Sequence, residues 1–313
     1  MYWWKFVMML QRKKRKRPFM FGGIVHQIAE ARAERQDWEA VLDKIELDNR
    51  KLFRREIEMY GEIIEDIRYI MKDYFDYWEN HPTDILKPIK HDGRRSEHEF
   101  RIELEPGLWF TGKIDMAGKA KKMRWVVEHK TFSRMPSEDD RWRSVQAAVY
   151  FRALEIMGFE PFDGILWDYV SSKPLNVPGQ LTATGKVSQA RIDSLPSRVN
   201  AWIKEEGHKK KDYLKLLADA EANRKNRFIR LYSPVKKPIV KMIWADFLET
   251  AREIAELHGQ RKAQTIGRHC TWGDYRDLCK AEATGADVDW IIEREFQKED
   301  LSHKRDNADR VEE

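Results

Sequence analysis

Two short charged motifs stand on neighbouring stretches in which polar and apolar residues alternate. The first is Gly112-Lys113-Ile114-Asp115, inside an expected strand over 108–117, and the second is Glu128-His129-Lys130, inside an expected strand over 124–132. A turn rich in glycine and lysine at 118–122 joins the two strands, as in a β-hairpin. Because side chains alternate across a strand, Glu128 and Lys130 share one face and His129 points to the other.

The residues around this hairpin predict a mixed α/β fold. Apolar residues at helical spacing predict helices over 21–35 and 37–78, and alternation predicts another strand over 97–105. Further along the chain we expect a helix over 139–157, a strand over 164–170, a loop over 175–185, and helices over 188–220 and 236–257. A strand that follows a helical crossover lies parallel to an earlier strand of its sheet. The order therefore predicts a mixed central sheet flanked by helices.

The length of 313 residues allows one large core or two modest ones. We interpret the chain as a single domain in four parts: a helical part (1–92), a core (93–175), a mostly helical part (176–297) and a charged tail (298–313) that we expect to be disordered. The apolar opening segment 1–10 precedes a basic run, which is the reverse of a secretory signal. It is also much shorter than the ~20 residues that span a bilayer, so no membrane association is expected.

The hairpin motifs carry the groups that phosphodiester hydrolysis requires. Carboxylates such as Asp115 and Glu128 are preferred ligands of hard divalent cations, which stabilise negative charge on a reacting phosphate. Lys130 would orient the attacking water and offset the developing charge. A single Glu-x-Lys on a strand is usually an exposed charge alternation. Both motifs in order on consecutive strands are much harder to obtain by accident.

Two further candidates lie on expected helices. Gln146 and Tyr150 are four residues apart and so share a helix face. His26 ends the stretch Phe21-Gly22-Gly23-Ile24-Val25-His26 near the start of the chain. Taken alone, each has an ordinary structural interpretation, as a packed tyrosine beside a surface glutamine or as a packed histidine. A neutral imidazole is nevertheless a competent ligand for Mn²⁺ and is tolerated by Mg²⁺. Glu99, on the expected strand 97–105, is a candidate supporting carboxylate.

The order GxxD, ExK and QxxxY resembles the PD-(D/E)xK nuclease superfamily, and within it the branch of RecB-like, Cas4-like and phage recombination nucleases. The resemblance covers residues 97–172 best, and His26 matches the FGxxxH stretch of that branch. It implies a restriction-endonuclease-like core with helical additions at both ends of the chain. The implied catalytic residues are Asp115, Glu128, Lys130, Gln146 and Tyr150. The implied ligands of Mg²⁺ or Mn²⁺ are His26, Asp115, Glu128 and the backbone carbonyl of His129.

The activity that this resemblance implies is metal-dependent cleavage of DNA. We expect an exonuclease of phage or bacterial recombination or repair, acting in the cytoplasm of a bacterial or phage-infected cell. A structure-selective endonuclease on the same fold and a catalytically idle DNA-binding protein are the alternatives. Intact Asp115, Glu128 and Lys130 argue against the idle protein. The chain has no GxxxxGK[ST] phosphate loop, so ATP-driven unwinding would need a helicase partner. A single-strand annealing or recombination protein is the other expected partner.

A basic run near the N-terminus is the candidate DNA contact. The net charge of +5 and the pI of about 8.9 suit a polyanionic partner. The run consists of Arg12, Lys13, Lys14, Arg15, Lys16 and Arg17, and it lies a few residues before His26. We predict that it binds DNA phosphates, although a solvated loop or a nuclear-localisation signal has the same composition.

The two cysteines, Cys270 and Cys279, form no disulfide framework, as is usual inside cells. Many Cas4-like proteins hold an iron–sulfur cluster on four cysteines, the last three in the order C-x2-C-x5-C. Here Gly273 stands at the middle position, and the aromatic run 2–7 resembles the stretch that follows the first cysteine. We therefore expect no iron–sulfur cluster in this chain. We expect packing by Trp272, Tyr275 and Leu278 to hold the C-terminal segment instead.

Overall fold

The structure is a computed structural model that describes residues 3–13, 17–49, 54–81, 84–179, 187, 192–257, 270 and 273–298. The chain divides into two compact units, and each is described by itself. The larger unit is Arg17–Leu248, and the smaller one combines the terminal segments Met1–Lys16 and Glu249–Glu313. The expected single-domain organisation stays a prediction.

A mixed sheet forms the centre of the larger unit. Its strand order is β2-β4-β5-β6-β7, with β3 paired to β4. The strands are β2 (Lys87–Pro88), β3 (Ser96–Glu105), β4 (Leu108–Ala120), β5 (Met123–Phe132), β6 (Gly164–Ser171) and β7 (Phe228–Pro234). β6 runs parallel to β5 and every other pairing is antiparallel. The predicted mixed sheet and the parallel last strand of its core are confirmed, whereas β7 was not anticipated.

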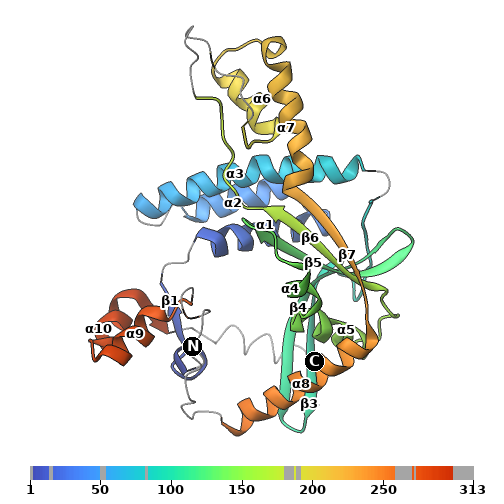
Figure 1. The fold of residues 1–313 in the computed structure, drawn as a ribbon, viewed down its shortest axis with the longest axis vertical. Coiled ribbons are helices and arrows are strands. Elements are labelled where there is room, and N and C mark those ends of the chain that lie inside the picture. The colour runs from blue at the N-terminus through green and yellow to red at the C-terminus, as the bar shows by residue number, and fades with distance from the viewer. Residues whose placement is uncertain are drawn as a thin grey trace. The chain divides into compact units, whose positions relative to one another are not determined.

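Helices cover both faces of this sheet (Figure 1). On one side, α1 (Arg17–Ala33), α2 (Trp38–Asn49) and α3 (Arg54–Glu79) form a core with residues of β6 and β7. On the other side, α5 (Val145–Ile156) packs against β3, β4, β5 and β6, after the short capped helix α4 (Glu138–Trp142). The helix expected over 37–78 is therefore two helices, with residues 50–53 outside the described part.

The helices after β6 correct one prediction. The helix expected over 188–220 is instead α6 (Pro196–Glu205), a 3₁₀ turn η2 (Lys210–Tyr213) and α7 (Leu214–Arg227), with their own apolar cluster around Val199, Trp202 and Leu216. Proline is favoured in a first turn, which explains the start at Pro196. Gly207 follows α6 with φ 68°, a left-handed conformation that glycine adopts without strain. The next helix, α8 (Lys237–Glu256), agrees with the expected 236–257.

The smaller unit joins the two ends of the chain. It contains a π-helical turn η1 (Trp3–Val7), β1 (Leu10–Arg12), α9 (Arg276–Thr284), α10 (Val288–Glu295) and β8 (Phe296–Lys298), and β1 pairs antiparallel with β8. Tyr275 and Leu278 are buried in its core with Trp4 and Phe296, which confirms these two anchors. Trp272 and the expected disordered residues 299–313 lie outside the described part. None of the helices in the described residues is long and apolar enough to cross a membrane.

The glycine of the GxxD motif has a packing role. Gly112 on β4 stands opposite Phe100 on β3, and the Phe100 ring is only 6% exposed. A Cβ atom added at Gly112 would lie under 3.0 Å from two ring carbons of Phe100, which is too close for a real contact. The missing side chain therefore lets the ring cross the strand a short distance before Asp115.

We predict that Gly112→Ala destabilises the fold by about 1–3 kcal/mol, because overpacking a well-filled core moves neighbouring groups. The measurement is the free energy of unfolding from urea titration. Gly61→Ala is the matched control, since no described atom lies within 4 Å of its added Cβ and alanine favours α3 by up to about 1 kcal/mol. Equal loss of stability in both variants would contradict the packing role.

Candidate active site

The regular alternation of β4 is interrupted at Asp115. Ile114 packs with Val126 in the cluster beneath α5, whereas Met116 packs with Val127 in a different cluster. Val126 and Val127 are consecutive on β5 and so face opposite sides of the sheet. Residues two apart on a regular strand share a face, but Ile114 and Met116 lie on opposite faces. The alternation of side chains along β4 is therefore shifted at Asp115, so the direction of the Asp115 side chain is not set by the alternation of its neighbours.

Glu97 lies across from this interruption on β3. The pairs on either side of it are Ser96↔Met116 and His98↔Ile114. Glu97 has φ 52°, a left-handed conformation that is uncommon for residues other than glycine and is frequent at functional sites. It is 9% exposed. The two irregular positions, Glu97 and Asp115, thus bring two carboxylates together from adjacent strands.

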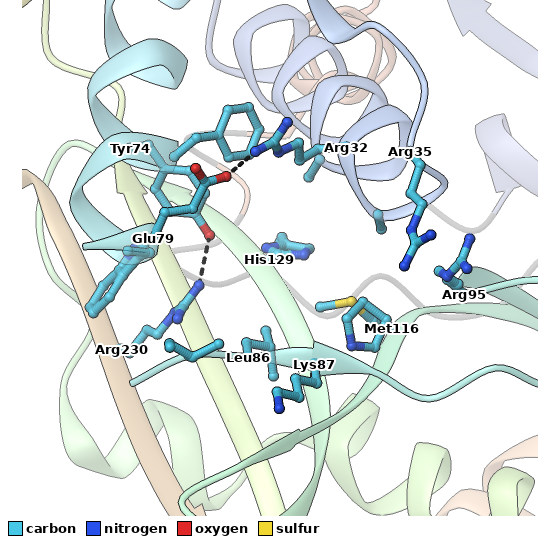
Figure 2. A pocket seen from close by; sticks show the side chains of 16 residues that line it. Arg32, Arg35, Tyr74, Glu79, Leu86, Lys87, Arg95, Met116, His129 and Arg230 are labelled. Carbon is cyan, nitrogen blue, oxygen red and sulfur yellow. Dashed lines mark hydrogen bonds and ion pairs between the residues drawn. The ribbon is translucent and has the colours of Figure 1, made fainter. Parts of the chain in front are cut away.

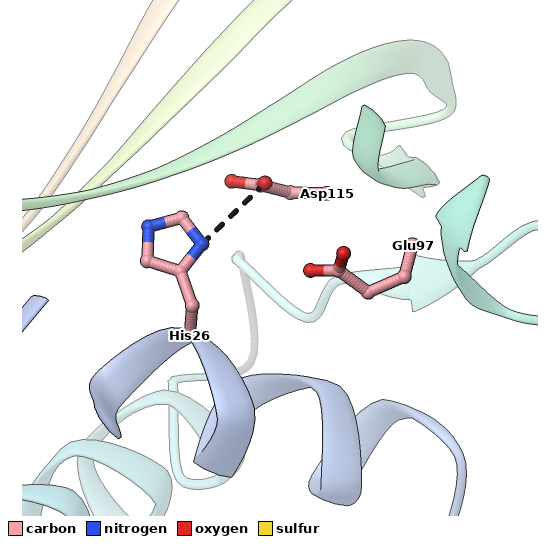
Figure 3. A group of neighbouring side chains, drawn as sticks. All are labelled: His26, Glu97 and Asp115. Carbon is pink, nitrogen blue, oxygen red and sulfur yellow. Dashed lines mark ion pairs between the residues drawn. The ribbon is translucent and has the colours of Figure 1, made fainter. Parts of the chain in front are cut away.

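A histidine from α1 completes a three-residue group (Figure 3). One ligand atom from each of His26, Glu97 and Asp115 can be chosen so that all three lie within 4.8 Å of one another. His26 Nδ1 is 3.4 Å from Asp115 Oδ1, and Asp115 Oδ2 accepts a hydrogen bond of 2.8 Å from the backbone N–H of His129. Glu97 Oε2 lies 2.7 Å from Lys113 Nζ. We call these three residues the acidic cluster.

Glu128 is the most deeply buried carboxylate of the site. It is 1% exposed, and its Oε1 lies 2.5 Å from Lys130 Nζ. Its Oε2 is also buried, yet it has no hydrogen-bond partner among the described residues. Burial and the nearby charge of Asp115 raise the pKa of Glu128 to about 7, against the opposing effect of Lys130. A buried acceptor without a donor is costly, and a cation would satisfy it and favour the ionised form.

The charges of His26 and Asp115 support each other. Burial acts to raise the pKa of Asp115, but its hydrogen bond with His26 and the nearby imidazole charges outweigh burial and lower it. Burial likewise acts to lower the pKa of His26, and its hydrogen bond to Asp115 raises it overall. The set of carboxylate oxygens and imidazole nitrogen in this region suits a hard divalent cation such as Mg²⁺ or Mn²⁺.

A chain of hydrogen bonds links Lys130 to α5. Lys130 Nζ donates to Gln146 Oε1 at 3.0 Å, and Gln146 Nε2 donates to the Tyr150 hydroxyl at 2.8 Å. The Tyr150 hydroxyl in turn donates to the backbone carbonyl of Lys113 at 2.9 Å. The structure thus brings Gln146 and Tyr150, which share one face of α5, to the same site as Glu128 and Lys130.

His129 points to the opposite side of the sheet from Glu128, as the alternation predicts. Its Nδ1 lies 3.8 Å from Oδ2 of Asp168, which is fully buried. That carboxylate accepts hydrogen bonds from the Tyr74 hydroxyl at 2.5 Å and from Arg230 Nε at 3.1 Å. Burial lowers the pKa of His129, and this outweighs the opposing attraction of Asp168 and Asp115. Metal binding by its backbone carbonyl stays a prediction.

The described members of the basic run have partners within the protein. Arg12 pairs with Asp277 and Glu295, and Lys13 donates to the backbone carbonyl of Glu293. Arg17 lies 3.2 Å from Asp66. Lys14, Arg15 and Lys16 lie outside the described residues. DNA contact by this run therefore stays a prediction.

Sequence reasoning missed Glu97 and considered Glu99 instead. Glu99 stands opposite Lys113 in the regular part of the β3–β4 ladder and is exposed. Simple alternation would treat the two glutamates as equivalent, since they are two residues apart. They differ because the positive φ at Glu97 breaks the alternation, and no spacing rule indicates that angle.

Comparison with known proteins agrees with this geometry. The sequence profile of the PD-(D/E)XK nuclease superfamily matches residues 2–280. The chain therefore belongs to the PD-(D/E)XK nuclease superfamily. Its mixed sheet flanked by helices is consistent with that fold, and membership implies a metal-dependent nuclease that acts on DNA. A search of curated proteins found no match to this chain.

We predict that Glu97→Gln weakens Mn²⁺ binding about tenfold or more, because an amide removes a charged oxygen from the acidic cluster. Glu99→Gln is the matched control, being the same change two residues away on an exposed position of β3. The measurement is direct titration of Mn²⁺ binding by electron paramagnetic resonance, without DNA. Equal affinities for the two variants would exclude Glu97 from the metal site.

Proposed function

We propose that this protein is a Mg²⁺- or Mn²⁺-dependent deoxyribonuclease whose catalytic residues are Asp115, Glu128, Lys130, Gln146 and Tyr150. The observation that carries the proposal is the buried Oε2 of Glu128, which lacks a donor among the described residues and lies in a site with Asp115 and Lys130. A buried carboxylate oxygen without a donor destabilises the fold if the site is purely structural. In a site that binds a cation, the cation satisfies that oxygen.

The ligands that we propose for the cation are His26, Glu97, Asp115, Glu128 and the backbone carbonyl of His129. When bound, the cation supplies positive charge for the phosphate and makes a coordinated water more acidic. His26 and Asp115 are held in place by their mutual contact and by the N–H of His129. The protein thus prepares these donors before substrate arrives, which lessens reorganisation during the reaction.

In the proposed mechanism, Lys130 acts on the reacting groups. Its ammonium is fixed between Glu128 Oε1 and Gln146 Oε1, yet its side chain remains 38% exposed and so accessible to substrate. From there the ammonium can orient the attacking water and offset charge on the phosphate. Gln146 holds it from α5, and Tyr150 ties that helix to β4 through the carbonyl of Lys113.

Within the superfamily, we propose an exonuclease of the RecB-like or Cas4-like branch that acts in phage or bacterial recombination or repair, in the bacterial cytoplasm. The proximity of His26 to Asp115 supports this branch, since its FGxxxH stretch implies a histidine ligand. A helicase or a single-strand annealing protein is the proposed partner. We further propose that the chain holds no iron–sulfur cluster. The second candidate function is a structure-selective endonuclease on the same site.

We predict that Asp115→Ala and Glu128→Ala each reduce DNA cleavage to background while DNA affinity changes little. The carboxylates serve the metal, whereas affinity comes mainly from cations on phosphates. End-labelled DNA is incubated with Mg²⁺, Mn²⁺ or EDTA, and binding is measured separately by fluorescence anisotropy in EDTA. Glu99→Ala, the control on β3, retains cleavage. Metal-dependent cleavage at the normal rate by either site variant would refute the assignment.

We also predict that the enzyme degrades linear DNA and leaves a covalently closed circle intact, because an exonuclease requires a strand end. The assay compares a labelled single strand, a linear duplex and a closed circle at equal nucleotide concentration. The endonuclease alternative gives the opposite result, with the circle cut as fast as the linear forms. A circle linearised beforehand by a restriction enzyme controls for its sequence.

A further inference from the structure

A cavity of about 550 Å³ lies between α1, α3, β2 and the sheet, all in the larger unit (Figure 2). Its volume is in the range of small-ligand sites. Its apolar wall includes Ile85, Leu86, Pro88 and Met116, and the ring side of His129 also lines it. We call it the α1–α3 cavity. It is distinct from the acidic cluster, whose residues do not line it.

Several cations line the α1–α3 cavity without a matching anion. Arg32 is paired with Glu79, and Arg230 with the buried Asp168. By contrast, Arg35, Lys87 and Arg95 make no side-chain ion pair among the described residues. Arg35 and Arg95 both line the cavity, and Figure 2 draws them toward the same end of it. Their positive charges would favour an anion bound at that end.

A buried donor without an acceptor also lines the cavity. Trp78 is 8% exposed, and its Nε1–H has no hydrogen-bond partner among the described residues. The Arg230 guanidinium lies 4.0 Å from the centroid of the Trp78 ring and is fixed by Asp168 and by the carbonyl of Asp84. The cavity thus offers cations and an indole donor beside apolar surface. That combination suits a phosphate attached to a sugar and a planar base.

The cavity lies close to the candidate active site. Four of the proposed metal ligands are one to three positions from a cavity residue in the sequence, in the pairs His26 and Ala29, Glu97 and Arg95, Asp115 and Met116, and Glu128 and His129. Consecutive strand residues point to opposite faces, so the cavity meets the site through a ring contact: the His129 ring, which lines the cavity, has its centroid 6.3 Å from that of His26. A ligand in the cavity therefore lies beside the ring that neighbours His26 of the acidic cluster.

We propose that the α1–α3 cavity binds a phosphate, with its sugar and base, of the DNA strand that is cut, beside the phosphate at the acidic cluster. This inference rests on the proposed nuclease function. Arg35 and Arg95 donate charge-assisted hydrogen bonds to the phosphate, and the apolar wall contacts the base or sugar. The cavity thereby positions the strand, and its residues are positioning residues that do not touch the bond that breaks.

The test is the double variant Arg35→Gln with Arg95→Gln. Glutamine is used because it keeps a long side chain, and Arg35 has φ 61°, so its backbone should be disturbed as little as possible. DNA affinity is measured by anisotropy in EDTA across a salt series. The slope of log affinity against log salt is expected to fall by roughly 0.7 to 0.9, the contribution of the one phosphate that the two arginines neutralise.

The control is Arg152→Gln with Lys241→Gln, the same loss of charge at half-buried Arg152 of α5, which pairs with Glu155, and at exposed Lys241 of α8, neither of which lines the cavity. The control variant should have the same slope of log affinity against log salt as the wild type. The variant Arg35→Lys with Arg95→Lys keeps both charges, so its slope should stay close to that of the wild type. Circular dichroism confirms that each variant is folded. An equal slope for the cavity variant and the control would overturn the proposal.

Thermal shift with inorganic phosphate and with a deoxynucleoside monophosphate separates the sources of the anion. One outcome would overturn the proposal that the cavity binds the DNA strand: either ligand stabilises the wild type, while the cavity variant keeps the wild-type slope of log DNA affinity against log salt. The cavity would then be a site for free anions. Because binding is measured in EDTA, it does not depend on cleavage. A changed slope in a protein that never cleaves DNA would sustain the cavity assignment while the nuclease proposal fails.

Discussion

The interruption of side-chain alternation at Asp115 and Glu97 is the constraint on which the candidate site depends. A regular β3–β4 ladder would keep Ile114 and Met116 on one face of the sheet, with Asp115 on the other. At the interruption, β4 changes the face to which its apolar residues point, and Glu97 adopts a left-handed backbone conformation. Irregular strand positions are common next to active sites because they redirect single side chains. Here they bring two carboxylates to His26.

The resulting site gives each carboxylate one cationic partner but leaves one buried carboxylate oxygen unsatisfied. Lys113 pairs with Glu97, Lys130 with Glu128, and His26 with Asp115, yet Glu128 retains a buried oxygen without a donor. Burial next to another carboxylate raises the pKa of Glu128 to about 7. A divalent cation relieves both the repulsion and the missing hydrogen bond. The buried, unsatisfied oxygen of Glu128 thus lowers the stability of the protein without metal and also makes the site suitable for metal binding.

A buried ion pair supports this site from the other face of the sheet. Asp168 on β6 is fully buried and binds Arg230 on β7 and Tyr74 on α3. Burial acts against the charge of Arg230, but the attraction of Asp168 outweighs it and raises the pKa of the guanidinium. Removing either partner would leave an uncompensated buried charge, which is strongly destabilising. The pair lies beside His129 and lines the α1–α3 cavity through Arg230, so it links the helical layer to the strand that carries Glu128.

The sequence by itself determined the features that depend on local spacing. These are the mixed sheet, the shared face of Glu128 and Lys130, the opposite facing of His129, and the pairing of Gln146 with Tyr150 on one helix. Periods of two and 3.6 residues act within single elements, so they can be seen in the residues alone. Only the tertiary structure decided which glutamate of β3 joins the site, because the backbone angle of Glu97 arises from contacts across the sheet. The internal ion pairs of Arg12 and the strand β7 depend likewise on partners that are distant in sequence. Such contacts leave no periodic trace in the chain.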